Sequence, residues 1–229
     1  GFWLNGRNVR LVGAARHQDR AGLGNALTAA EHEEDMQILR DMGANTVRLA
    51  HYQHAQYFYD LCDKYGLVAW AEIPYITEHM PEATANTLSQ MEELVLQNYN
   101  HPSIICWGLS NEITVTTGVT EDLTANHRLL NDLCHRLDAT RPTTMAHAFM
   151  LDPNDPFVQL PDICSYNLYY GWYLGELQQN DEFFDTFHKN HPDRVIGLSE
   201  FGADANPAYQ SARPERGDWS ESYQAIYHE

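Results

Sequence analysis

Two glutamates that follow apolar stretches are the residues best suited to chemistry in this chain. The apolar run 195–198 leads through Ser199 to Glu200, and the apolar run 104–109 leads to Glu112. A single glutamate in such a place is most often a solvated strand end or a helix cap, because glutamate is rarely buried without a partner. Two of them facing one substrate could instead divide acid and nucleophile work between them.

The elements that would position these glutamates alternate between short strands and helices. Asn5-Gly6 between apolar flanks predicts a hairpin over residues 2–9, and Thr28 with Glu31 predicts a capping box at a helix start. The apolar patterns predict strands over 9–13, 45–50, 67–73, 104–112, 142–147, 162–166 and 194–199, and helices over 28–42, 53–65, 88–99, around 130–137 and over 177–188. This alternation implies a parallel sheet with right-handed crossovers.

Polar side chains follow several of the predicted strands. They are His17, Arg48 with His51, Asn111 with Glu112, Asn167 with Tyr169, and Glu200. An open sheet gathers functional residues at one switch point, whereas a barrel gathers them from many strands around one mouth. The distribution therefore predicts an α/β fold of the TIM (β/α)8 barrel type.

Two further features bear on this mouth. Arg48 inside a strand is costly unless it is paired, so it is either salt-linked to strand-end carboxylates or in contact with substrate. The aromatic run 169–173, which contains Tyr169 and Trp172, suits stacking on the face of a sugar. Packing at strand ends is the alternative interpretation of this run.

Length, composition and charge narrow the class of protein. The 229 residues suffice for one α/β barrel, with 43% hydrophobic and 20% charged residues and no apolar stretch long enough to cross a membrane. The net charge of −18 repels nucleic acid and anionic lipid, which leaves a neutral small molecule as the better partner. Sequence fingerprints of nucleotide cofactors are absent.

The cysteines bear on the cellular compartment. Cys62, Cys106, Cys134 and Cys164 form no C-x-x-C pair and lie in apolar patterns, so buried free thiols in a reducing, cytoplasmic compartment are expected. The chain begins at Gly1 rather than at methionine, so we expect a processing boundary there. Secretion after removal of a signal peptide is the alternative.

Nine stretches in a fixed order carry a resemblance to a known family. They are residues 4–7, 13–17, 45–52, 61–68, 100–104, 110–112, 162–164, 169–173 and 199–202. Together they resemble the catalytic barrel of glycoside hydrolase family 2, which includes β-galactosidases, β-glucuronidases and β-mannosidases. Within this family, the segments 16–17, 51–52 and 71–79 look most like those of bacterial β-galactosidases.

The resemblance implies roles for individual residues. Glu112 matches the family's general acid/base, and Glu200 matches its nucleophile. Asn111 matches the residue that hydrogen-bonds the sugar 2-hydroxyl, and Tyr169 matches the tyrosine beside the nucleophile. The resemblance also places His17 and His51 near the bound sugar.

A metal ion and other cofactors are not expected. Many β-galactosidases of the family hold magnesium with a Glu-x-His pair after the third strand, whereas Glu78 and His79 are adjacent here. The remaining closely spaced histidines are expected in solvent or in the core rather than as metal ligands.

The family also has an eighth strand and preceding β-rich domains, and neither is recognisable in these residues. We therefore expect residues 1–229 to form one catalytic barrel domain without its eighth strand, as a fragment of a longer multidomain enzyme. A barrel that lacks a strand exposes two sheet edges. Cover by a second copy of the chain, as a homo-oligomer, is the alternative.

The sequence as a whole predicts a retaining exo-glycosidase that hydrolyses terminal β-D-galactosides through a covalent glycosyl-enzyme. A β-glucuronidase of the same family is one alternative, although the net charge disfavours an anionic sugar. A truncated barrel that binds carbohydrate without catalysis is a second hypothesis. A structural domain completed by a strand from another chain is a third.

Overall fold

A parallel sheet of seven strands forms the centre of the computed structural model, which describes residues 1–229. The strands run in sequence order, β3 (Gly13–Arg16), β4 (Thr46–Leu49), β5 (Val68–Glu72), β6 (Ile104–Asn111), β7 (Thr143–Ala148), β8 (Ile163–Asn167) and β9 (Ile196–Glu200). The edge strands β3 and β9 approach one another without pairing. The sheet is therefore a nearly closed barrel, as predicted for a TIM barrel without its eighth strand.

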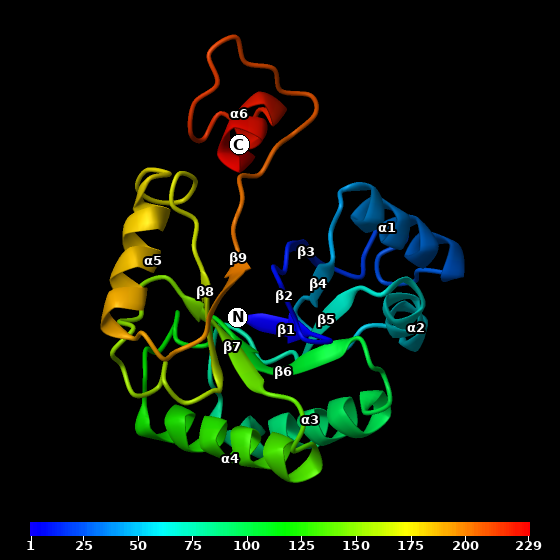
Figure 1. The fold of residues 1–229 in the computed structure, drawn as a ribbon, viewed down its shortest axis with the longest axis vertical. Coiled ribbons are helices and arrows are strands. Elements are labelled where there is room, and N and C mark those ends of the chain that lie inside the picture. Colours follow the sequence, from blue (N-terminus) through cyan, green and yellow to red (C-terminus); the bar gives the residue numbers. More distant parts are fainter.

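Helices cover the outside of this sheet (Figure 1). They are α1 (Ala29–Asp41), α2 (Gln56–Tyr65), α3 (Thr84–Asn98), α4 (Glu121–Leu137) and α5 (Gln179–Asn190), with a short 3-10 turn at Pro81–Ala83. No α-helix lies between β7 and β8, where the chain follows an irregular link. No helix is long and apolar enough to cross a membrane.

The local signals at the start of the chain behave as predicted. The strands β1 (Phe2–Leu4) and β2 (Arg7–Val9) form an antiparallel hairpin, and Asn5 and Gly6 both have positive φ, at 51° and 75°. This is the backbone that a two-residue hairpin turn of the primed type requires. Helix α1 begins at a complete capping box of Thr28 and Glu31.

The strand predicted over 9–13 is wrong in its position. Ladder pairing begins only at Gly13, which lies opposite Thr46, and continues to Arg16. The residues before Gly13 are held instead by the side chain of Asn45, which accepts from Val12 N at 2.8 Å and donates to Arg10 O at 2.8 Å. A side chain thus occupies the backbone groups that a longer strand would have used.

The hydrophobic core follows the helix stripes seen in the sequence. One cluster of 26 buried residues joins the sheet to helices α1 to α4 and contains Met36, Phe58 and Trp107. A smaller cluster around Tyr166 and Phe187 packs α5 against β8. The four cysteines are buried and free, as predicted.

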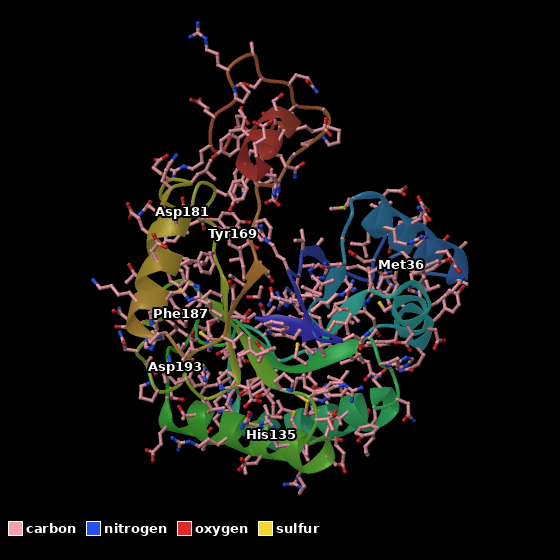
Figure 2. The ribbon with its side chains drawn as sticks, in the orientation of Figure 1. Met36, His135, Tyr169, Asp181, Phe187 and Asp193 are labelled. Atoms are coloured by element: carbon pink, nitrogen blue, oxygen red, sulfur yellow. The ribbon has the colours of Figure 1, made fainter.

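The C-terminal segment carries a last helix, α6 (Glu221–His228), which lies away from the other helices beyond the end of β9 (Figure 1). Trp172, Ala203 and Tyr223 form a small buried cluster between the segment and the loop after β8. Figure 2 shows Tyr169 at the end of the sheet that faces this segment. The segment therefore lies beside the mouth of the barrel.

Candidate active site

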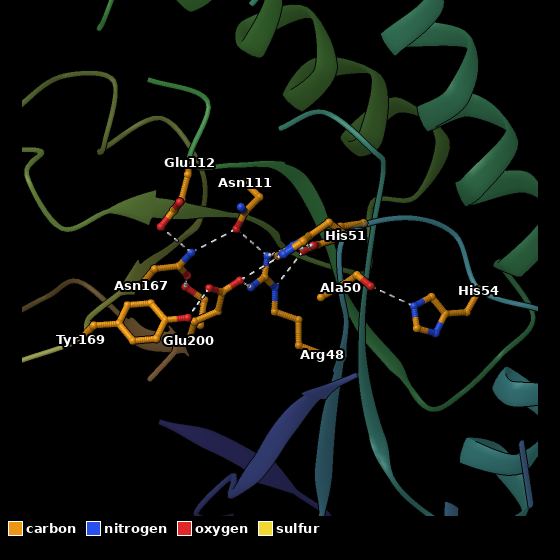
Figure 3. Close-up of polar contacts among 11 residues, drawn as sticks. Arg48, Ala50, His51, His54, Asn111, Glu112, Asn167, Tyr169 and Glu200 are labelled. Carbon is orange, nitrogen blue, oxygen red and sulfur yellow. Dashed lines mark hydrogen bonds and ion pairs between the residues drawn. The ribbon is translucent and has the colours of Figure 1, made fainter. Parts of the chain in front are cut away.

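Arg48 lies at the centre of a polar network at the C-terminal ends of the strands (Figure 3). It is only 5% exposed, and its guanidinium donates to both oxygens of Glu72, at 2.8 and 3.0 Å, and to Oε1 of Glu200 at 2.6 Å. Burial opposes its charge, but the two carboxylates outweigh burial and raise the pKa of Arg48. Arg48 is thus the structural, salt-linked arginine that was one of the two alternatives from sequence.

Glu200 ends β9 and receives donors on both of its oxygens. Arg48 donates to Oε1, and the hydroxyl of Tyr169 donates to Oε2 at 2.7 Å. Burial and the neighbouring Glu200 charge raise the pKa of Tyr169, so its phenol stays protonated and can donate. These two donors occupy both carboxylate oxygens of Glu200 and fix its orientation.

Glu112 follows β6 in a different environment. Its backbone has φ of 45°, a region that residues other than glycine rarely adopt, and its N–H donates to Ala146 O at 2.8 Å. Its Oε1 accepts from Asn167 Nδ2 at 3.0 Å. No cation contacts this carboxyl group. The two glutamates therefore have different partners, an arrangement that suits two carboxyl groups to different catalytic roles.

Two amides connect these glutamates. Asn111 Oδ1 accepts from Arg48 Nη2 at 2.9 Å and from Asn167 Nδ2 at 3.2 Å. The ladder shifts register just before each amide, between Gly108 and Asn111 and between Tyr166 and Asn167. Such irregularities redirect side chains at the ends of barrel strands. The two amides thereby link Arg48 to the Glu112 carboxyl group.

The two predicted histidines lie at the same mouth. His51 Nδ1 is 3.0 Å from Glu72 Oε1, and its Nε2 is 3.4 Å from Glu200 Oε1. The exposed ring of His17 lies edge-on to His51 with centroids 5.0 Å apart. Partial burial and the neighbouring His51 lower the pKa of His17, so this ring is neutral at pH 7.

Trp172 corrects one expectation. Trp172 is only 7% exposed and packs against Trp219 and Tyr223 of the C-terminal segment rather than presenting an open face. The aromatic run therefore splits, since Tyr169 faces Glu200 while Trp172 anchors the segment. The packing interpretation therefore holds for Trp172. The aromatic residues that cover it come from a segment without a clear hydrophobic pattern, so the sequence did not reveal this contact.

Sequence reasoning assigned no role to two members of the network. Glu72 is 1% exposed and contacts both Arg48 and His51, and Asn167 is fully buried and donates to Asn111 and Glu112. Both are the last residue of a strand, so the rule that singled out Glu200 also applies to them. Glu72 is hidden inside a longer apolar run, and Asn167 is recognisable only as a polar strand end before an aromatic run.

His79 lies apart from the site. It bonds Tyr75 Oη and, at 2.6 Å, Asp122 Oδ2, and so belongs to a buried network with Asn126. No group of three His, Cys, Asp or Glu side chains is arranged to hold a metal ion. The absence of a bound metal stays a prediction, because nothing in this geometry tests it.

Two surface cavities lie outside the network. One of about 330 Å³ runs along α5, between Gln179 and His191, beside the link that replaces a helix after β7. Another of about 250 Å³ lies beside Tyr52 and Pro74. Neither contains Glu112 or Glu200. The site is identified by its polar contacts rather than by the depth of a cavity.

Comparison with known proteins decides the family. Residues 1–227 match the family model described as Glycosyl hydrolases family 2, TIM barrel domain. The chain belongs to glycoside hydrolase family 2. The resemblance drawn from the nine sequence stretches is thereby confirmed, and so is the barrel fold.

Several similar family 2 proteins are named β-glucuronidase. One from Bacteroides fragilis is 41% identical over 100% of this chain, which spans 34% of that enzyme. The structure of an FMN-binding β-glucuronidase from Facaelibacterium prausnitzii L2-6 is 46% identical with TM-score 0.96, over 100% of this chain and 36% of that one. Bacteroides uniformis β-glucuronidase 2, covalently bound to cyclophellitol-6-carboxylate aziridine, is 37% identical with TM-score 0.95, over 100% of this chain and 29% of that one.

A β-galactosidase from Thermoanaerobacterium thermosulfurigenes is also a relative. It is 35% identical over 62% of this chain and 19% of that enzyme. The chain spans about a quarter to a third of the length of the first curated relatives.

Proposed function

We propose that this chain is the catalytic barrel of a retaining β-glucuronidase. The observation that carries the proposal is the unequal environment of the two strand-end glutamates. Glu200 accepts from Arg48 and Tyr169, while Glu112 accepts from the neutral amide of Asn167. Glu200 thus faces a cation and a hydroxyl donor, whereas no cation contacts Glu112, and this difference suits the two carboxyl groups to the separate roles of nucleophile and proton donor.

In the proposed mechanism Glu200 attacks the anomeric carbon, and the bond from that carbon to the leaving oxygen breaks. Glu112 gives its proton to the departing oxygen, which leaves as an alcohol or phenol and leaves Glu112 ionised. Glu112 then takes a proton from water, whose oxygen displaces Glu200 from the anomeric carbon. The second displacement restores both glutamates and releases the sugar with its configuration retained.

The network also supplies groups for binding the sugar. The Oδ1 of Asn111 is occupied by Arg48 and Asn167, which leaves Nδ2 to donate to a sugar hydroxyl. His51 lies between Glu72 and Glu200, and exposed His17 lies next to it, so both rings border the place of the sugar. The partner we propose is a small carbohydrate, and the mechanism uses no metal.

The choice of glucuronide over galactoside draws on the relatives. Their names are mainly β-glucuronidase, and one solved relative is covalently bound to an inhibitor with a carboxylate at carbon 6. A carboxylate at that carbon distinguishes a glucuronide from a galactoside. The galactoside that the sequence segments favoured therefore has less support than the glucuronide.

The test compares three aryl glycosides with the same leaving group, a β-glucuronide, a β-galactoside and a β-mannoside. We expect the parent chain to hydrolyse the glucuronide fastest and Glu200→Gln to lose all turnover. The matched control is Glu92→Gln, because Glu92 is exposed on α3 and should leave turnover unchanged. Turnover by Glu200→Gln, or a preference for the galactoside, would overturn the proposal.

A further inference from the structure

Asn167 is the one side chain that contacts both Glu112 and the Arg48–Asn111 part of the network. It ends β8, is fully buried, and lies next to Ser199 of β9. Its Nδ2 is 3.0 Å from Glu112 Oε1 and 3.2 Å from Asn111 Oδ1, and its Oδ1 is 2.7 Å from Ser199 Oγ. None of the stretches that carry the family resemblance includes this residue.

The orientation of this amide is determined by its neighbours. The nitrogen and oxygen of an asparagine amide have nearly the same shape, so their places follow from the hydrogen bonds around them. Asn111 must present Oδ1 because Arg48 donates to that atom at 2.9 Å. A reversed Asn167 would place its own oxygen against both this Oδ1 and Glu112 Oε1. Ser199 completes the arrangement, because its hydroxyl can donate to Asn167 Oδ1.

A fixed donor on Oε1 has a consequence for where Glu112 carries a proton. An oxygen that accepts from an amide N–H is better suited to be the carbonyl oxygen of a protonated carboxyl group, because the hydroxyl oxygen of a carboxylic acid is the weaker acceptor. Oε2 of Glu112 has no hydrogen-bond partner within the chain, and so it is the oxygen that remains for the proton. The amide is neutral, so it allows both the protonated and the ionised state of the carboxyl group.

We propose that Asn167, oriented by Ser199, is a positioning residue that directs the transferable proton of Glu112 to Oε2. This inference rests on the proposed function, in which Glu112 is the general acid and base. Asn167 acts through Glu112 and needs no contact with the substrate. Its loss should therefore impair proton transfer selectively and leave the attack by Glu200 intact.

The experiment measures kcat/KM for two aryl β-glucuronides, one with phenol and one with 2,4-dinitrophenol as the leaving group. Phenol needs a proton to depart, whereas dinitrophenol departs readily without one. For Asn167→Ala we expect a loss of about 10–100-fold with the phenyl substrate, below the full contribution of about 10²–10⁴-fold from general acid catalysis because Glu112 itself remains. With the dinitrophenyl substrate we expect a loss below about 3-fold.

Asn126→Ala is the matched control, since Asn126 is a buried asparagine that bonds Tyr75 and Thr87 away from the site. This variant should change kcat/KM for both substrates by the same factor. Asn167→Asp adds a negative charge beside Glu112, so the alkaline limb of the kcat/KM profile should move to higher pH. A merely structural role for Asn167 would not move that limb.

Ser199→Ala should also lower kcat/KM more for the phenyl than for the dinitrophenyl substrate, but by a smaller factor than Asn167→Ala. Ser165→Ala should show no such difference between the substrates, because buried Ser165 bonds Thr144 instead. An equal loss on both substrates for Asn167→Ala, with an unmoved alkaline limb for Asn167→Asp, would overturn the inference. Failure of the parent on both glucuronides is a different result. It would overturn the proposed function, and the inference would fall with it.

Discussion

Replacement of Arg48 by methionine should destabilise the fold severely. Glu72 is 1% exposed and the Glu200 side chain 16%, so both carboxylates would lose the cation that they share. Removing one partner of a buried ion pair typically costs about 3–5 kcal/mol, because the remaining charge stays buried without compensation. We expect this loss in the free energy of unfolding at pH 7.

Urea unfolding followed by circular dichroism measures this loss. With a denaturant slope of about 3 kcal/mol/M, the midpoint should fall by about 1–1.7 M. Glu72→Gln should also destabilise, but the double variant should lose less than the sum of the single losses. The difference between sum and double variant should be about 0.5–3 kcal/mol, as expected for residues in contact.

The matched control is Arg20→Met, which removes a partly exposed arginine paired with exposed Glu34 and, at 3.5 Å, with Asp35; because Asp35 keeps its shorter bond to Arg16, the midpoint should stay nearly unchanged. A loss below about 1 kcal/mol for Arg48→Met would refute the reasoning. So would full additivity with Glu72→Gln. Either result would mean that the carboxylates reach water or another cation when Arg48 is absent.

Two further predictions concern acid stability and the nucleophile. Burial lowers the pKa of His54 to about 3, of His127 to about 4 and of His147 to about 3, whereas unfolded histidines titrate near pH 6.5. Their contribution to the free energy of unfolding is therefore complete above about pH 6.5. It is lost as the pH falls below that value, by up to about 4 kcal/mol per pH unit for the three histidines together. Urea midpoints at pH 7.5 and pH 5.5 measure this loss, and equal midpoints would contradict it. Tyr169→Phe removes the hydroxyl that donates to Glu200, a bond to a charged group worth about 1.5–3 kcal/mol, so kcat should fall by about 10–150-fold. Aryl glucuronide kinetics measure the effect, and a change below about 2-fold would show that this hydrogen bond does not assist the nucleophile.

The predictions that succeeded from sequence rest on short-range physics. The hairpin follows from two adjacent residues that tolerate positive φ, and α1 begins where Thr28 and Glu31 can satisfy its free N–H groups. The barrel follows from strand and helix patterns that need no knowledge of distant contacts. The places of Glu112 and Glu200 follow from the end of an apolar run.

The predictions that failed depend on residues far apart in the chain. The first barrel strand begins later in the chain than predicted, because Asn45 bonds to residues 33 and 35 positions before it. Trp172 is covered by Trp219 and Tyr223, which lie about fifty residues later in a segment whose sequence shows no apolar pattern that would predict a buried contact. No local sequence rule connects such distant segments. Neither the start of the first barrel strand nor the burial of Trp172 could therefore be predicted from the sequence.

The alternation of strands and helices, the family and the two strand-end glutamates could all be inferred along the chain, because backbone preferences and hydrophobic periods are properties of neighbouring residues. The groups that surround those glutamates could not, because they come together only in the folded barrel. Arg48 meets Glu72, which is 24 residues away, and Glu200, which is 152 residues away, and Asn167 meets Glu112 across 55 residues. These contacts depend on the order and register of the strands, which bring the ends of distant segments to one mouth.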